Sequence, residues 1–335
     1  NNNFKPLPFT TTRASSATVV NKQGLIETVG SGIPRIDFSD DANGALLLEP
    51  TRSNSILYSQ ETDNAYWYKS NVIITPNTNI SPDGTLNADT FTSSSTNSVI
   101  YRTGVSCGSL SFFAKDIDLS IGKFRVSVDG VGVCLWNKDG TLHSVNGGTA
   151  TNGIDYGNGW FRFTFNVTSG SVVNYGIGDG SGNENILVFG LQNEPSSTYS
   201  TSYIKTVGTT QTRSADTASD AGSSTVINSS EGVLYAEISA LSNPVDSPKN
   251  ITISDGTPNK YLRIEFYQDG RVYGNVYDGT SVSASFVVNQ DEYNKIAIQY
   301  SYSGCKLYVN GSGLNFAAKN FPSNTLNILR FSNAG

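Results

Sequence analysis

The chain has 335 residues, with 22 Lys and Arg against 28 Asp and Glu, which gives a formal net charge of −6. This length predicts two or three domains. The isoelectric point near 4.9, the absence of a basic cluster and the lack of an apolar run of roughly 20 residues argue against nucleic acid and membrane as partners.

The chain opens with residues 1–54, which contain four prolines and too few apolar residues for a core of their own. We expect an extended N-terminal segment that packs on the following domain or on another subunit. Residues 55–213 form the predicted middle domain. Ser, Ala, Asp, Thr and Gly dominate residues 214–230, a composition typical of a linker. The remaining residues, 231–335, form the predicted C-terminal domain.

Short strands with turns between them are predicted throughout both domains. Apolar and polar residues alternate over 161–167, 261–267 and 306–310, which is the period of a half-buried strand. Asp-Gly turn signals recur between such runs, at residues 83–84, 129–130, 139–140, 255–256, 269–270 and 278–279. The pattern predicts an all-β fold with two antiparallel β-sandwich domains of jelly-roll or lectin-like type.

Three cysteines, Cys107, Cys134 and Cys305, are too few and too scattered for a disulfide framework or a zinc site. Buried free thiols are the simpler interpretation. A disulfide between Cys107 and Cys134 stays open as an alternative, if neighbouring strands bring the two together.

A series of spaced motifs runs through the first two thirds of the chain. They lie at 13–18 (RASSAT), 24–26 (GLI), 33–38 (IPRIDF), 46–54 (LLLEPTRSN), 81–85 (SPDGT), 157–162 (GNGWFR), 189–194 (FGLQNE), 201–204 (TSYI) and 212–216 (TRSAD). In kind and order they resemble a module of tailed-phage structural proteins, in which a short N-terminal piece precedes a carbohydrate-binding-module-like jelly roll. Trp67 and Trp160 match positions of that module that look like packing anchors.

The C-terminal part contains strand-like runs at residues 232–238, 294–300 and 306–311. The first resembles the opening strand of a laminin-G-like or concanavalin-A-like sandwich, and the other two resemble its late pair of strands. Such domains close with one more strand after a motif like the one at 326–330. No such strand follows before Gly335, so we expect the domain to be incomplete at its C-terminus.

No constellation in the sequence predicts catalysis. His143 is the single histidine, and nothing around it resembles a nucleophile elbow. The paired acids of a glycoside hydrolase are also missing, and Glu265 beside Arg263 is expected to form a solvated charge pair. We therefore expect a non-enzymatic protein with no catalytic residues.

Two acidic stretches are candidates for a structural calcium ion, which jelly-roll modules often hold. Asp116 with Asp118 is one pair, and Asp179 with Glu184 is the other. Neither stretch has the ligand count of an EF-hand loop, so ordinary acidic turns are the alternative. No other cofactor is predicted.

With no catalytic constellation, ligand binding is the function that the sequence favours. Sites for sugars pair an exposed aromatic ring with polar side chains. Trp136 beside Asn137 is the first candidate, because it lies next to a turn among polar residues. Tyr101 with Arg102 is the second. The third is a cluster in the C-terminal domain that could equally bury against a neighbouring subunit: Tyr267, Tyr273 and Tyr277.

The resemblance implies a structural protein on the surface of a tailed-phage virion, such as a head fibre, spike or tail fibre. Its partners would be other virion proteins and host-surface polysaccharide, and by analogy with such fibres it would be a homo-oligomer, a trimer. Two alternatives stay open. One is a secreted bacterial polysaccharide-binding protein or accessory module of a glycan-degrading enzyme. The other is a purely architectural virion decoration protein.

Overall fold

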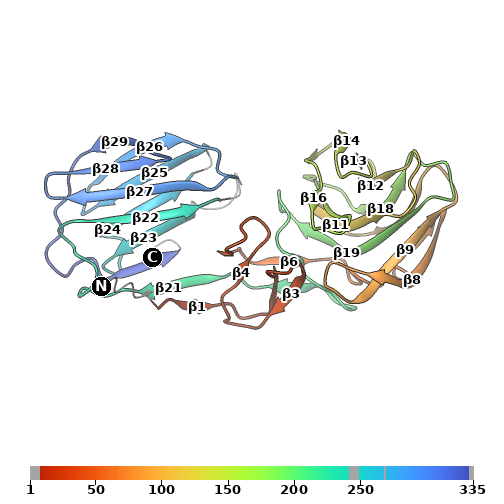
Figure 1. Cartoon of the computed structure of the whole chain (residues 1–335), viewed down its shortest axis with the longest axis horizontal. Helices are drawn as coiled ribbons and strands as arrows, with labels where there is room; N and C mark the ends of the chain where they lie inside the picture. Colours follow the sequence, from red (N-terminus) through yellow and green to blue (C-terminus); the bar gives the residue numbers. More distant parts are fainter. Residues whose placement is uncertain (1–7, 241–248, 268, 332–335) are drawn as a thin grey trace. The chain divides into compact units, whose positions relative to one another are not determined.

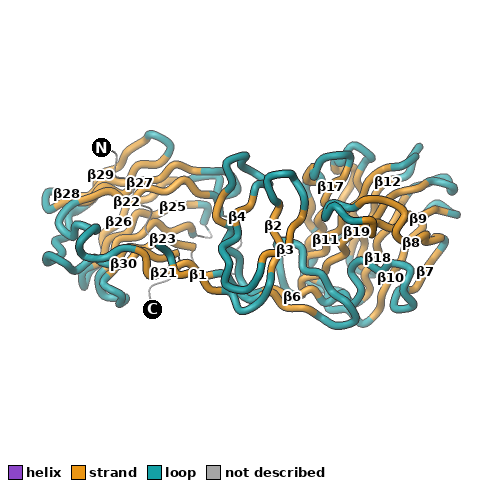
Figure 2. The backbone as a smooth tube through the Cα atoms, turned by 60° about the horizontal axis from the view of Figure 1, so that its bottom comes forward, coloured by secondary structure: helices purple, strands orange, loops and turns teal. Residues whose placement is uncertain are grey.

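The computed structural model describes residues 8–240, 249–267 and 269–331. Within these residues every regular element is a β-strand, and Figure 2 shows strands and loops but no helix. The sheets are antiparallel. The predicted all-β sandwich fold is confirmed. This part of the chain also contains no helix long and apolar enough to cross a membrane.

Two compact units make up the chain, and each has its own core (Figure 1). The N-terminal sandwich comprises Arg13–Asp216. The C-terminal sandwich combines the described residues from Thr217 onward with those up to Thr12.

The N-terminal sandwich consists of two facing sheets. The first has the order β14-β13-β12-β18-β10-β7, with β7 at Tyr68–Ser70, β10 at Ser98–Thr103, β12 at Lys123–Val128, β13 at Gly132–Trp136, β14 at Leu142–Asn146 and β18 at Val172–Gly178. The second has the order β15-β17-β11-β19-β9-β8 with β16 beside β17, where β8 is Val72–Ile80, β9 Leu86–Ser93, β11 Gly108–Asp116, β15 Thr149–Ala150, β16 Ile154–Asp155, β17 Trp160–Asn166 and β19 Asn185–Pro195.

Strand alternation explains how this core forms. Phe163 and Phe165 of β17 point inward together with Phe112 of β11, and the facing sheet contributes Phe124 and Tyr175. All five side chains are fully buried. At roughly 1.5–3 kcal/mol for each large apolar side chain removed from water, such a cluster drives the two sheets together.

The N-terminal segment packs on the outer face of the second sheet. That face carries Phe113, Trp160 and Phe189, and together with Tyr203 and the partly buried Ile26 they form a second cluster. The covering strands are short: β2 (Ala17–Val20), β3 (Ile26–Val29), β4 (Ile36–Asp37), β5 (Ala45–Leu46), β6 (Arg52–Asn54) and β20 (Gln211–Arg213).

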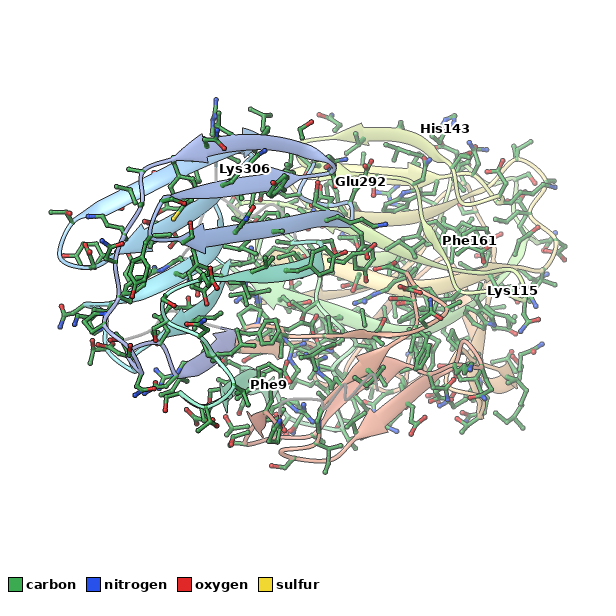
Figure 3. All side chains as sticks on the ribbon, turned by 60° about the vertical axis from the view of Figure 1, so that its left-hand side comes forward. Phe9, Lys115, His143, Phe161, Glu292 and Lys306 are labelled. Atoms are coloured by element: carbon green, nitrogen blue, oxygen red, sulfur yellow. The ribbon has the colours of Figure 1, made fainter. Side chains whose placement is uncertain are left out.

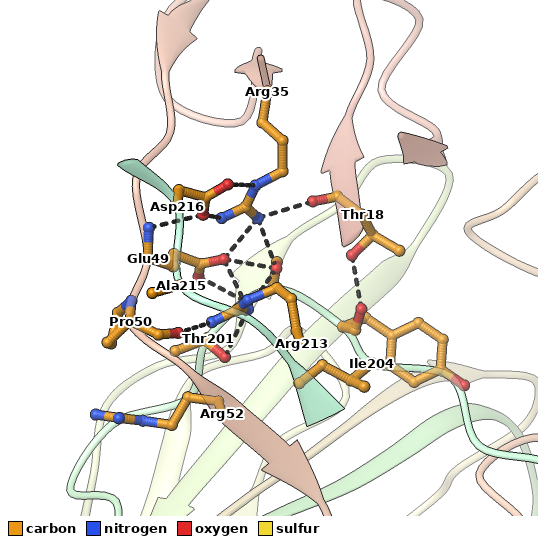
Figure 4. A network of polar contacts seen from close by, with 12 residues as sticks. Thr18, Arg35, Glu49, Pro50, Arg52, Thr201, Ile204, Arg213, Ala215 and Asp216 are labelled. Atoms are coloured by element: carbon orange, nitrogen blue, oxygen red, sulfur yellow. Dashed lines mark hydrogen bonds and ion pairs between the residues drawn. The ribbon is translucent and has the colours of Figure 1, made fainter. Parts of the chain in front are cut away.

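A buried network of charges holds this segment in place (Figure 4). Arg35 pairs with both carboxylates of the network, Glu49 at 2.6 Å and Asp216. Arg13 donates to Asp216 at 2.8 Å, and Arg213 lies 2.8 Å from Glu49. These five side chains come from both ends of the unit, so the network joins the first forty residues of the unit to its last few residues.

The environment of Glu49 keeps it charged. Burial alone would raise the pKa of this carboxyl, but Arg213, Arg35 and two hydrogen bonds from Ser202 outweigh burial and hold the pKa below its ordinary value. Breaking a buried, hydrogen-bonded ion pair by removing one partner typically costs about 3–5 kcal/mol. The network is therefore a structural clamp.

The C-terminal sandwich also has two sheets. One has the order β1-β21-β30-β23-β24-β25-β26, where β1 is Thr10–Thr12, β21 Thr217–Ala221, β23 Lys249–Ser254, β24 Tyr261–Phe266, β25 Arg271–Tyr277, β26 Ser281–Val287 and β30 Ile328–Phe331. The other has the order β22-β27-β28-β29, at Gly232–Ile238, Asn294–Ser301, Gly304–Val309 and Ser312–Phe316. The sheets approach closely at Gly274, where an added Cβ would lie 3.0 Å from Leu307.

The structure differs from the predicted linker at 214–230. Strand β21 lies inside the seven-stranded sheet, between β1 and β30, and Ala218 and Ala221 are fully buried. Backbone hydrogen bonds and small side chains suffice for such a position, so a low apolar content did not mean an exposed chain. The predicted N-terminal segment 1–54 is also divided, because β1 belongs to the C-terminal sandwich while residues 13–54 belong to the other unit.

Candidate functional site

The outward side of β24 and β25 is rich in tyrosine. In β24 the side chains of Leu262, Ile264 and Phe266 point into the core, so the alternate positions face outward. The register of β24 with β25 then aligns the outward residues in rows. We call this surface the tyrosine face: Tyr261, Arg263, Glu265, Tyr267, Tyr273, Asn275 and Tyr277.

Two pairs of tyrosine rings lie at opposite ends of the tyrosine face. Tyr261 and Tyr277 are stacked, with ring centroids 5.4 Å apart and planes at 13°. Tyr267 and Tyr273 meet edge to face at 4.9 Å. Glu265, the neighbour of Tyr273, lies four positions along the strand from Tyr261, which places the two pairs about 14 Å apart.

A charged and hydrogen-bonded centre lies between these pairs. Arg263 donates to Glu265 at 2.8 Å, and Asn275 donates to the other carboxylate oxygen at 3.3 Å. The Arg263 guanidinium also stacks on Tyr261, 3.5 Å from the ring centroid. Glu265 is only 3% exposed, so the expectation of a solvated charge pair is wrong: the carboxylate is buried and hydrogen-bonded.

The phenol hydroxyl groups of Tyr267 and Tyr273 remain neutral near pH 7. A hydrogen bond to Asp269 raises the pKa of Tyr273, with a smaller contribution from burial. Burial, followed by the nearby Glu265, raises the pKa of Tyr267. The edge strand β26 adds further hydroxyls, since Ser281 donates to Asn275 and Ser285 accepts from Arg271.

The arrangement can bind a flat, hydroxyl-rich ligand. Tyrosine rings supply apolar area for C–H groups, and the phenol, amide and serine groups supply donors and acceptors. The charges at the centre and rim are paired, as Arg263 with Glu265 and, more loosely, Arg271 with Asp269 at 3.9 Å. The face thus offers polar contacts with little net charge.

Of the residues predicted for binding, Tyr267, Tyr273 and Tyr277 lie together on the tyrosine face. The sequence interpretation missed Tyr261, which completes a stacked pair, and treated Arg263 and Glu265 as ordinary surface charges. The alternation over 261–267 contains the signal for all three, because it places Tyr261, Arg263 and Glu265 on the same side as Tyr267.

Trp136 is not a ligand platform. It is fully buried, packs on Phe163 with centroids 4.9 Å apart, and donates its indole N–H to the backbone oxygen of Thr151 at 2.7 Å. Its neighbour Asn137 shapes the following turn by bonding to Thr141. The turn misled the sequence interpretation, because Trp136 is the last residue of β13 and still points inward. Trp67 and Trp160 are buried, as predicted for packing anchors.

Tyr101 lies in a smaller aromatic patch on the first sheet of the N-terminal sandwich. Its ring stacks on Tyr68 at 5.2 Å, and Tyr68 is about half exposed. Arg102 serves packing here, since its guanidinium lies 4.4 Å from the ring of Tyr66 and donates to that residue's backbone oxygen. Tyr68 was missed, although its strand pairs directly with that of Tyr101.

Three of the four carboxylates predicted as calcium ligands accept hydrogen bonds from protein donors. One oxygen of Glu184 accepts hydrogen bonds from the backbone N–H groups of Ser120, Ile121 and Gly122. Burial alone would raise the pKa of Glu184, but hydrogen bonds, first that from the Ser120 side chain, outweigh burial and lower the pKa to about 2. Asp116 caps the N–H of residue 119, and Asp118 bonds to residue 185.

Asp179, the remaining candidate, adopts a left-handed backbone with φ of 56°. No three His, Cys, Asp or Glu side chains come together as a metal site would need, within the described ranges. The calcium ion stays a prediction.

The cysteines are free and buried, so the alternative of a Cys107–Cys134 disulfide is wrong. Burial raises the pKa of Cys107 to about 11 and that of Cys134 to about 12. Such thiols are inert packing groups.

No family model matches the chain, and no curated protein matches it. Among solved structures it is similar to domains LG4-5 of the mouse laminin alpha1 chain, at 12% identity over 71% of this chain and 79% of that chain. The TM-score is 0.23, and a likeness at this level supports no statement about ligands. The resemblance to phage proteins therefore depends on the motifs alone.

Proposed function

We propose that this chain is a non-enzymatic adhesive protein of a tailed-phage virion that binds host-surface polysaccharide through the tyrosine face. One observation carries the binding part of the proposal. Two tyrosine pairs flank a hydrogen-bonded Arg263–Glu265–Asn275 centre on one outward sheet surface. An extended surface of this kind suits the interior of a sugar chain, whose rings would lie along the strands.

The chemistry of the face favours a glycan over a protein partner. Protein interfaces have a desolvated apolar centre with a polar rim. Here the order is reversed, with polar groups in the centre and rings at both ends. The pairing of charges further favours a polysaccharide with little charge.

The virion part of the proposal comes from the motifs and their order. They support a head fibre, spike or tail fibre exposed on the particle surface, with other virion proteins as its assembly partners. A homo-oligomer, specifically a trimer, follows by analogy with fibres of this kind. The proposal assigns no catalytic residue.

The test measures affinity of the full chain for a panel of bacterial surface polysaccharides, with Tyr273→Ala and Tyr277→Ala as variants. Tyr235→Ala is the matched control, because Tyr235 is 56% exposed on β22, in the other sheet of the same sandwich. An aromatic contact worth about 1–1.5 kcal/mol corresponds to roughly a tenfold loss of affinity in each variant. Equal binding by all three variants, or no binding by the wild type, would overturn the assignment.

A further inference from the structure

A cleft of about 490 Å³ opens in the N-terminal sandwich, in the size range of small-ligand sites. Four loops contribute to it: the turn between β2 and β3, the loop after β4, the turn between β8 and β9, and the loop that leads into β17. Its lining includes Gln23, Leu25, Ile80, Lys115, Asn158 and Trp160.

Backbone hydrogen bonds and turn geometry fix the positions of these loops. Ile26 donates to the backbone oxygen of Pro82 at 2.9 Å, which fixes the first turn against the second. Gly24 has a φ of 79° and Asn158 one of 52°, the left-handed region that turns the chain sharply. The hollow is thus a consequence of how the N-terminal hairpin docks.

Several polar side chains in this cleft are uncommitted. Lys115 is half-buried on the outer side of β11 and projects from the ribbon in Figure 3. Its ammonium group, like the side-chain amides of Gln23 and Asn158, makes no hydrogen bond or ion pair with any residue that the structure describes. Asp155 also lines the cleft, and one of its oxygens accepts from Gly157.

Apolar groups provide the rest of the lining. Trp160 is nearly buried at the floor, while Leu25, Ile80 and Ile154 are partly exposed at the rim, with Ile154 exposed to 57%. A cation, an anion and two amides beside such surface match a molecule whose groups both donate and accept hydrogen bonds and that carries no net charge. Sugar hydroxyls have this property.

We propose that this cleft binds the end of a neutral glycan, one or two sugar rings at a time. The inference depends on the proposed function only for the class of ligand. The tyrosine face would bind along a chain, whereas the cleft would take its terminus or a short branch. The two surfaces therefore predict different responses to ligand length.

The test titrates the full chain with neutral monosaccharides and disaccharides at millimolar concentration, by calorimetry and tryptophan emission. The panel comprises glucose, galactose, mannose, rhamnose, N-acetylglucosamine and their common disaccharides, with glucuronate as the acidic arm. Lys115→Ala and Gln23→Ala are the variants. Lys138→Ala is the matched control, because Lys138 is exposed in a turn that does not line the cleft.

We expect at least one neutral sugar to bind, and both cleft variants to weaken it at least fivefold while Lys138→Ala and Tyr273→Ala do not. Small-sugar binding lost in Tyr273→Ala instead would place it on the tyrosine face and overturn the cleft. Selective binding of glucuronate would overturn the neutral ligand. If no small sugar binds while polysaccharide binding persists, the cleft proposal fails and the proposed function stands.

Discussion

Replacing Glu49 by Gln tests whether the buried charge network holds the N-terminal segment on its sandwich. Gln keeps the size of the side chain and one oxygen acceptor, but it removes the charge that Arg35 and Arg213 share at 2.6 and 2.8 Å. Both guanidinium groups are about 1% exposed, so water cannot compensate for the lost charge. We expect the free energy of unfolding of this sandwich to fall by about 3–5 kcal/mol.

Urea unfolding followed by tryptophan emission measures this sandwich alone, because Trp67, Trp136 and Trp160 all lie within it. With a denaturant slope of about 2–3 kcal/mol per molar, the expected loss lowers the midpoint by roughly 1–2.5 M urea. Glu61→Gln is the control, since Glu61 is exposed and should change stability by less than about 0.5 kcal/mol.

The pH dependence gives the same network an independent signature. The pKa of Glu49 is lower in the folded than in the unfolded state, so its stabilisation is fully present above the unfolded pKa of about 4.3 and is lost as pH falls through the folded pKa. Glu49→Gln should therefore flatten the acid limb of the stability curve. A loss below about 1 kcal/mol at pH 7 with an unchanged acid limb would refute the clamp.

Two further substitutions address residues whose roles differ from the sequence expectations. Glu184→Gln should lower the stability of the N-terminal sandwich by about 1–3 kcal/mol, measured by the same urea titration, because it weakens an acceptor shared by three backbone N–H groups. The effect should vanish as the wild type is acidified from pH 4.5 towards its folded pKa of about 2. Trp136→Ala should cost about 3–5 kcal/mol as a core cavity. In the folded fraction, polysaccharide affinity should equal that of the wild type, and a selective loss of affinity would contradict the buried role.

The fold was predictable because strand alternation is a local property. The run over 161–167 gives the inward and outward sides of β17 directly, and Asp-Gly turns mark where strands end. The boundary between the two units could not be predicted from the sequence. Strand β21 has no large apolar side chain, and its place in the sheet is fixed by backbone pairing with β1 and β30. Pairing between segments two hundred residues apart leaves no mark in composition.

The candidate site was predictable only in part, for a related reason. The outward set on β24 follows from period-two alternation, and so does the grouping of Tyr267 with Tyr273. Trp136 has polar neighbours and is the last residue of β13, and at the end of a strand the sequence alone does not tell whether an aromatic side chain faces water or the core. The cleft around Lys115 could not be predicted from the sequence, because four loops from distant parts of the chain create it.

The motifs that suggested a phage protein include the residues of the clamp. Arg35, Glu49, Arg213 and Asp216 come from three of these motifs, and the structure gathers them into one buried network. A buried network tolerates few side chains, whereas an outward sheet face can change its residues without unfolding the protein. In a scaffold of this kind the clamp residues would stay the same, while the residues of the binding surfaces would change with the ligand. On the proposed function, the ligand specificity of this chain should accordingly be sought on the tyrosine face, where none of these motifs lies. The cleft differs, because residues of four motifs contribute to its lining.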